Sequence, residues 1–173
     1  MELKFSAFDS KEIIDFLKEQ VVDGEVKVDA QTLQTQSYSE RLAGNHQPAL
    51  AFVEAKSIAD VQGTLTTARK YHLPVVTQNR FTSTVIGADA VSGGIILSTA
   101  KMNQVLELNI EDGYAIVQPG VVNGDLDKLA RKHGLFYAPD PASKPLSGIG
   151  GNIGTNAGGL SGVRYGSTRD NVL

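Results

Sequence analysis

The chain has 173 residues, with 16 Lys and Arg against 19 Asp and Glu, a formal net charge of −3 and no cysteine. The lack of cysteine excludes disulfides and is compatible with a reducing compartment, and the balanced charges are unlike the basic surface of a nucleic-acid-binding protein. No apolar run approaches the ~20 residues of a membrane-spanning helix, and the first residues lack a signal-peptide pattern. We therefore expect a soluble, cytoplasmic protein of one domain, built of two lobes.

The first predicted element is an amphipathic helix near the N-terminus. Asp9 precedes Glu12 by three residues, which is typical of a helix start, and the segment EIIDFLKEQVV that follows ends near Asp23 and Gly24. The polar residues 25–47 show no clear period, so we interpret them, including the run QTLQTQS, as loop. We assign residues 1–48 to an N-terminal helical segment ahead of the main domain.

A strand–helix–strand pattern follows. Residues 49–54 are apolar and short enough for a buried strand, and the pair Ser57 and Asp60 is typical of a helix start. Apolar residues then recur at spacings of three and four, which predicts a helix, and Pro74 ends it before the apolar pair Val75 and Val76. Two strands joined by a helix should run parallel with a right-handed crossover. This pattern predicts a small lobe over residues 49–90.

The second half has a different character. Residues 94–98 read as a strand, and Asp112-Gly113 between two apolar segments is a hairpin signal. Asn123 is the predicted cap of a helix with acidic residues in its first turn and basic residues near its end, and Gly134 terminates it. We therefore predict an α+β fold: the small parallel βαβ lobe, then a mainly antiparallel lobe with helices over residues 91–173.

The run PLSGIGGNIGTNAGGLSGVRYG at residues 145–166 is the most informative segment. Glycine permits close approach of another molecule to the backbone, and exposed N–H groups can receive a phosphate or a flat heterocycle. The neighbouring charges favour an anion, since the sequence has no acidic residue between Asp140 and Asp170 but contains Lys144, Arg164 and Arg169. A flexible linker or a purely structural, glycine-rich turn region are the alternatives.

Other nucleotide-binding and metal-binding patterns are missing from the sequence. There is no G-x-x-x-x-G-K-[ST] segment, and the glycines of the run lack the spacing of G-x-G-x-x-G. The three histidines are not spaced as a metal-binding pair, so we predict no metal.

Four segments together resemble a known family. They are the PVV strand at 74–76, GGIILS at 93–98 with Met102-Asn103, VQPGV at 117–121, and the long stretch from GLFYAPDPAS at 134–143 to RYGSTRD at 164–170. The chain, over roughly residues 38–173, resembles the FAD-binding domain of the vanillyl-alcohol-oxidase-type flavoproteins. Within them it is most similar to the branch that contains glycolate oxidase and D-lactate dehydrogenase.

This resemblance implies an FAD held non-covalently between two lobes, with a small-molecule substrate bound by a later domain. Carried over by position, the residues implied to line the cofactor are Pro119, Gly120, Asp140, Pro141, Ser143, Gly150, Gly151, Asn152, Gly154, Thr155, Asn156, Gly158 and Gly159.

One loop departs from the family pattern. The loop after the PVV strand is normally glycine-rich and cradles the pyrophosphate, whereas this chain has Asn79, Arg80 and Phe81 there. Arg80 could neutralise a phosphate, and Asn79 and the hydroxyls of Thr82 and Ser83 could bind it. The alternative is that the loop no longer binds phosphate.

The resemblance implies an FAD-dependent oxidoreductase acting on a small 2-hydroxy acid such as glycolate or D-lactate. We name no catalytic residue, because the substrate-binding groups would come from a C-terminal domain absent from these 173 residues, and we expect the chain alone to be inactive. Residues 169–173 look like the start of a strand, so we expect the front part of a longer protein, or a short relative of one, with an edge open to homo-oligomer pairing. The alternatives are a non-catalytic module with a degenerate phosphate loop and an FAD-dependent sugar or alcohol oxidase.

Overall fold

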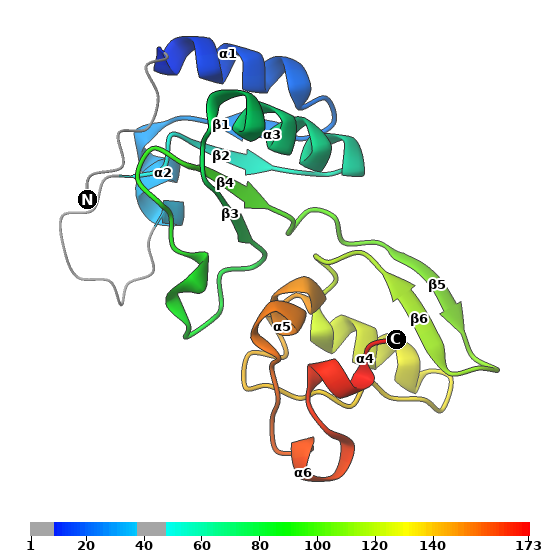
Figure 1. Ribbon diagram of the computed structural model, residues 1–173. Helices are drawn as coiled ribbons and strands as arrows, with labels where there is room; N and C mark the ends of the chain where they lie inside the picture. The colour runs from blue at the N-terminus through cyan, green and yellow to red at the C-terminus, as the bar shows by residue number, and fades with distance from the viewer. Residues whose placement is uncertain (1–8, 38–47) are drawn as a thin grey trace. The chain divides into compact units, whose positions relative to one another are not determined.

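A computed structural model describes residues 9–37 and 48–173. The chain divides into two compact units (Figure 1). The first comprises Met1–Gln78 and Ile86–Lys101, and the second comprises Asn79–Val85 and Met102–Leu173. The sequence-based division differs, because it separated residues 1–48 and placed residues 91–101 with the second lobe.

The first unit is built on a four-stranded sheet in the order β1-β2-β4-β3. Strand β2 (Ala51–Glu54) and strand β3 (Val75–Gln78) each pair in parallel with β4 (Ile95–Ser98), and β1 (Glu25–Lys27) pairs antiparallel with β2. The expected parallel direction of β2 and β3 is confirmed, but β4 lies between them. All four residues of β4 are buried, as expected of a central strand.

Three helices cover this sheet. Helices α1 (Ser10–Gln20) and α3 (Ile58–Tyr71) pack on each other (Figure 1). On the opposite face, Leu33 of helix α2 (Ala30–Ser37) packs in a buried cluster with Phe52 and Ile96, since alternate strand residues face opposite sides.

The prediction of loop for residues 25–37 was therefore wrong, while residues 38–47 lie outside the described part. Helix α2 is polar, and it is anchored by the burial of Leu33 and of Ser37, whose hydroxyl accepts from the backbone N–H of Ala49 at 3.0 Å. Its first turn is closed by Asp29, whose carboxylate accepts from the backbone N–H of Thr32 at 2.8 Å. A short polar helix shows no clear apolar periodicity in its sequence, and whether the segment becomes helical depends on its packing against the sheet.

Asp60 ties the elements of the first unit together. Its side chain is fully buried, and its Oδ1 accepts from the N–H groups of Val22 and Asp23 at 3.0 Å. Its Oδ2 accepts from Lys56 and Ser57 at 2.9 and 3.1 Å, and Ser57 caps α3 in return, which confirms the predicted capping box. Burial raises the pKa of Asp60, but these backbone hydrogen bonds outweigh it and lower the pKa to about 2.

The second unit contains a hairpin and short helices. Strands β5 (Val105–Asn109) and β6 (Tyr114–Val117) form the predicted antiparallel hairpin, in which Gly113 has φ +71°. Helix α4 (Asn123–Arg131) follows, and then α5 (Ile149–Thr155) and α6 (Gly162–Tyr165) of the glycine run. Val121, Leu126 of α4 and Ile149 of α5 form a buried cluster, and Ala115 and Val117 of β6 pack against it.

Two local predictions for this unit were wrong. Asn123 does not cap α4, because its buried side chain donates to the carbonyl of Pro139 at 3.2 Å instead. Residues Thr168–Asn171 form a 3₁₀ turn, η2, closed by a capping box of Ser167 and Asp170, rather than the start of a strand.

Among the described residues, no helix combines the length and apolar character that a membrane span requires.

Candidate functional site

The turn at Pro119-Gly120 brings together three of the segments that the sequence marks as cofactor-binding. The carbonyl of Pro119 accepts from the side-chain amide of Asn79 at 3.0 Å and from the backbone N–H of Gly150 at 2.8 Å. The carbonyl of Gly120 accepts from Nε and Nη2 of Arg80 at 3.3 and 3.0 Å. The loop after β3, the turn after β6 and the start of α5 therefore form one hydrogen-bonded cluster within the second unit.

The altered loop after β3 is held by side chains. Arg80 is half-buried, and within the described chain no carboxylate forms an ion pair with it, so its positive charge is uncompensated there. Phe81 has φ +54°, a left-handed conformation that costs a non-glycine residue about 1 kcal/mol. The loop thus keeps a backbone shape that suits glycine while carrying larger residues.

The glycines of the run divide into packed and open positions. A Cβ on Gly150 would lie 2.7 Å from Cβ of Pro119, and a Cβ on Gly159 would overlap the carbonyl of Asp140. By contrast, a Cβ on Gly154 would meet no atom within 4 Å, and one on Gly151 or Gly158 would make only ordinary contacts at 3.5 and 3.7 Å. The packed glycines are required by the protein itself, whereas at the open positions no neighbouring atom excludes a side chain.

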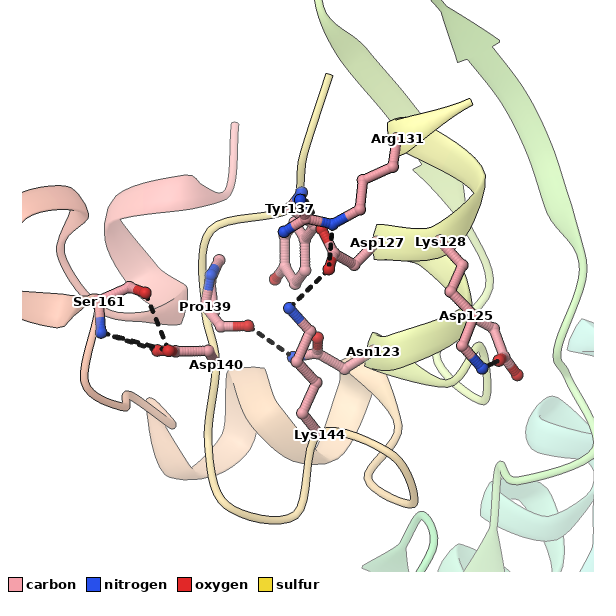
Figure 2. Close-up of polar contacts among 10 residues, drawn as sticks. All are labelled: Asn123, Asp125, Asp127, Lys128, Arg131, Tyr137, Pro139, Asp140, Lys144 and Ser161. Carbon is pink, nitrogen blue, oxygen red and sulfur yellow. Dashed lines mark hydrogen bonds and ion pairs between the residues drawn. The ribbon is translucent and has the colours of Figure 1, made fainter. Parts of the chain in front are cut away.

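Asp140 holds the second half of the glycine run (Figure 2). Its carboxylate accepts from the backbone N–H of Ser161 at 3.0 Å and from the Ser161 hydroxyl at 2.9 Å. Both bonds, together with the charge of Lys144, lower the pKa of Asp140. The carboxylate is thus engaged with the loop at 158–162, which gives Asp140 a structural task in addition to the cofactor contact expected of it.

A charged cluster around the buried carboxylate of Asp127 holds the segment that leads to the glycine run. Asp127 of α4 accepts from Nζ of Lys144 at 2.9 Å, from Nε of Arg131 at 3.0 Å and from the backbone N–H of Tyr137 at 3.0 Å (Figure 2). Burial raises the pKa of Asp127, but the bonds from Lys144, Arg131 and Tyr137 lower it further than burial raises it. Burial also raises the pKa of the Tyr137 hydroxyl.

Replacing Asp127 by asparagine should destabilise the second unit by roughly 2 kcal/mol, because two charge-assisted hydrogen bonds are lost and Lys144 is left three-quarters buried without its partner. Urea unfolding followed by circular dichroism measures this. The control is Asp125→Asn on the same helix. This substitution removes an exposed ion pair with Lys128 and should lower the free energy of unfolding by less than about 0.5 kcal/mol. Equal effects of the two variants would contradict the assigned role of Asp127.

The remaining predicted residues occupy the ends of α5 and two turns. Asn156 is the C-cap of α5 with φ +49°, and its Oδ1 accepts from Ser167 and Arg169. The Thr155 hydroxyl donates to the carbonyl of Gly151. The Ser83 hydroxyl accepts from the backbone N–H of Val85, and the neighbouring Thr82 is half-buried. Pro141 is buried, and the carbonyl of Ser143 accepts from the N–H groups of Leu146 and Ser147.

Sequence reasoning missed the roles of Ser161, Asp127 and Gly148. Ser161 lies 21 residues from Asp140, and Lys144 lies 17 residues from Asp127, so neither pair has a periodic or motif signal. Gly148 was visible in the run, but its contact with residue 79 depends entirely on tertiary structure.

The second unit fits a dinucleotide with a flat ring system. Bare backbone is open at Gly151, Gly154 and Gly158, and positive side chains stand at Arg80 and Arg164. In the part of the chain that the structure describes, the buried Nδ2 of Asn152, a residue 2% exposed, has no hydrogen-bond partner. Because nearly all buried polar groups are hydrogen-bonded, this donor is consistent with a site that a bound ligand completes. The donors are neutral or cationic, as a diphosphate-bearing ligand requires.

Comparisons with known proteins identify the relatives of this chain. The sequence profile of the FAD-binding domain family matches residues 49–173. The chain is 41% identical over 159 residues to a D-2-hydroxyglutarate dehydrogenase of Stutzerimonas stutzeri, covering 91% of this chain and 34% of that protein. It is 39% identical to glycolate oxidase subunit GlcD of Bacillus subtilis, covering 71% and 26% of the two chains, and 40% identical to a D-lactate dehydrogenase of Anaerostipes hadrus, covering 69% and 25%. The chain therefore spans about a quarter to a third of the length of these curated relatives.

Solved structures agree on the fold. The 4-ethylphenol oxidase of Gulosibacter chungangensis matches with a TM-score of 0.73 and 26% identity over 88% of this chain and 30% of that chain. An alkyldihydroxyacetonephosphate synthase matches with a TM-score of 0.80 and 22% identity over 94% and 35% of the chains. The predicted α+β class and the predicted cofactor are confirmed. The chain belongs to the FAD-binding domain family of the vanillyl-alcohol-oxidase-type flavoproteins, in the branch that contains glycolate oxidase and D-lactate dehydrogenase, and its cofactor is FAD.

Proposed function

We propose that this chain is the FAD-binding portion of an oxidoreductase that oxidises a small 2-hydroxy acid. The observation that carries the proposal is its identity of 39–41% to three proteins named for such acids: D-2-hydroxyglutarate, glycolate and D-lactate. These three compounds share a carboxylate beside a secondary or primary alcohol. The substrate of this protein is therefore expected to have the same reactive group.

The chain's own residues bind and orient the cofactor in this proposal. The open backbone at Gly151, Gly154 and Gly158 lies against the flat part of FAD, and Asn152 supplies a buried hydrogen-bond donor. Arg80, with Thr82 and Ser83 on the same loop, faces the diphosphate, which needs positive charge and donors. When bound, FAD supplies the redox chemistry by accepting the hydride of the substrate.

The other predicted cofactor contacts remain part of the proposal. They are Asn79, Pro119, Gly120, Asp140, Pro141, Ser143, Gly150, Thr155, Asn156 and Gly159. Their contacts within the protein support a role in shaping the site around the cofactor. We propose that the FAD is held non-covalently, which is supported by the lack of cysteine and of a histidine in a motif for covalent attachment among these residues.

The direct test is a titration of the purified chain with FAD, followed by flavin fluorescence and visible absorbance. We expect saturable binding of FAD, and no turnover of D-2-hydroxyglutarate, D-lactate or glycolate with an artificial electron acceptor. The same assay on a form extended by the C-terminal substrate domain of the relatives should show oxidation of one of these acids. Turnover by residues 1–173 alone would contradict the assignment of the substrate groups to that domain.

Two other functions predict different results. A non-catalytic module with a degenerate phosphate loop should remain colourless and should not respond to FAD, and the side chains at 79–81 are the observation that favours it. A sugar or alcohol oxidase should bind FAD but should prefer substrates without the carboxylate. A substrate panel on the extended form separates the latter from a 2-hydroxy-acid dehydrogenase.

We further propose a cytoplasmic location, which the cysteine-free sequence supports, and a homo-oligomeric state. Cell fractionation tests the first, and light scattering after gel filtration tests the second. Recovery in a membrane or periplasmic fraction, or a monomer at all concentrations, would contradict the respective proposal.

A further inference from the structure

Gly148 stands at the start of α5 in a conformation that does not need glycine. Its φ of −93° and ψ of 154° are extended values that any residue adopts. Its backbone pairs with Val122 in an isolated β-bridge, and the residue is buried. The reason for a glycine at this position must therefore be space.

That space is filled by the side chain of Asn79. A Cβ on Gly148 would overlap Oδ1 of Asn79, would lie 2.9 Å from its Cγ and would lie 3.2 Å from the carbonyl of Pro119. A Cβ on Gly151 would lie 3.5 Å from Cβ of Asn79, which is ordinary contact. The amide of Asn79 thus occupies the volume that a side chain at residue 148 would take.

The same amide is fixed at its other end. Nδ2 of Asn79 donates to the carbonyl of Pro119 at 3.0 Å, and this carbonyl also accepts from the N–H of Gly150 at 2.8 Å. Asn79 consequently connects three elements: its own loop, the turn at 119–120 and the first turn of α5. A side chain added at Gly148 would push the amide away from Pro119, because the amide is the movable atom group in the contact.

We propose that Asn79 is a positioning residue of the cofactor site and that Gly148 provides the space its side-chain amide needs. The inference rests on the proposed function, because the elements that Asn79 joins carry the open glycines of α5 and the hydroxyls at 82 and 83. By filling the space above Gly148 and bonding to Pro119, Asn79 fixes the distance between these two groups of cofactor contacts. Pre-organisation of this kind increases affinity without direct contact.

A double-mutant cycle tests the pair. Gly148→Ala in the wild-type background should raise the Kd for FAD about tenfold and lower Tm, because the alanine displaces the amide of Asn79. Asn79→Gly alone should also weaken FAD binding. In the Asn79→Gly background, however, Gly148→Ala should change Kd by less than about twofold, because the side chain that causes the overlap is then absent and only the 3.2 Å approach to the Pro119 carbonyl remains.

Two further variants separate volume from hydrogen bonding. Asn79→Asp keeps the volume but loses the donor to Pro119, so it should weaken FAD binding, and Gly148→Ala should remain harmful beside it. Gly162→Ala is the matched control, since a Cβ there meets no atom within 4 Å, and it should be tolerated in both backgrounds.

The measurements are the Kd for FAD, the visible circular dichroism of the bound flavin, and Tm without cofactor. Coupling in Tm together with coupling in Kd and an altered flavin spectrum would support the proposal. Coupling in Tm alone would overturn it, because the pair would then be only a stability contact, and so would the absence of any coupling. Failure of the wild-type chain to bind FAD would contradict the proposed function itself. The Tm values of the four variants would still report whether Asn79 and Gly148 are complementary.

Discussion

Replacing Gly159 by alanine is expected to weaken FAD binding about a hundredfold and to lower Tm, because the new methyl group has no room. A Cβ at this position would overlap the backbone carbonyl of Asp140 and would lie 2.5 Å from its Oδ1. Backbone atoms cannot turn aside as a side-chain end can. The loop at 158–162 would have to move, and the bonds between Asp140 and Ser161 would be lost with it.

Two other alanines on the same run serve as controls. Gly154 lies within α5 with open space around its Cβ position, so Gly154→Ala should raise stability by about 0.5–1 kcal/mol through helix propensity. Under the proposed function it should nevertheless weaken FAD binding, since the bare backbone faces the cofactor. Gly162→Ala should leave Kd nearly unchanged.

The three alanines thus give a distinctive pattern in two measurements, Tm without cofactor and Kd by flavin fluorescence. Gly159→Ala should worsen both, Gly154→Ala should worsen only Kd, and Gly162→Ala should worsen neither. Unchanged Tm and Kd in Gly159→Ala would contradict the tight packing against Asp140. Unchanged Kd in Gly154→Ala would show that the cofactor does not approach α5 at this point.

Asp60→Ala should destabilise the first unit by roughly 4 kcal/mol, which is a large fraction of the stability of most domains. The substitution removes the acceptor of four backbone N–H groups, those of Val22, Asp23, Lys56 and Ser57. The site is fully buried, so water replaces these bonds poorly. Urea unfolding followed by circular dichroism measures the loss.

The control for Asp60 is Asp15→Ala, at an exposed position of α1. Within the described residues the side chain of Asp15 makes no hydrogen bond or ion pair, so its replacement should change the free energy of unfolding by less than about 0.5 kcal/mol. A loss in Asp60→Ala as small as that in Asp15→Ala would contradict the central position of the Asp60 carboxylate.

Acid should weaken the fold through the same group. The pKa of Asp60 is lowered in the folded protein from 3.8 to about 2, so its stabilising contribution is complete above pH 4 and is lost as pH falls through 2. The difference corresponds to about 2 kcal/mol. The stability gap between wild type and Asp60→Ala should therefore narrow as pH is lowered over this range, and a constant gap would show that Asp60 does not titrate as expected.

The segments with strong local signals were predictable. The Ser57 and Asp60 pair and the Asp112-Gly113 turn each have a local physical cause, and each appears as expected. The helix α3 is also where its spacing predicts it, but the buried face is different: Ile58 and Leu65 are exposed, and Thr64, Thr67 and Tyr71 are buried in their place. Elements that depend on residues far away in the sequence could not be predicted. Helix α2 needs Phe52 and Ile96 to bury Leu33, and the position of β4 between β2 and β3 depends on pairing with strands that lie far from it in the sequence.

The order of residues was sufficient to place the chain in its family and to identify the cofactor, because four segments resemble the pattern of that family. The side-chain-poor, acid-free stretch with flanking cations agrees with this resemblance, since a diphosphate-bearing ligand requires neutral or cationic donors. Only the tertiary structure decided which glycines face open space and which pack against Pro119 or Asp140. It alone also showed that Asn79 and Arg80 bond to the carbonyls of Pro119 and Gly120. The physical reason is that spacing along a chain specifies local conformation, whereas free volume around a residue depends on atoms that come from anywhere in the sequence.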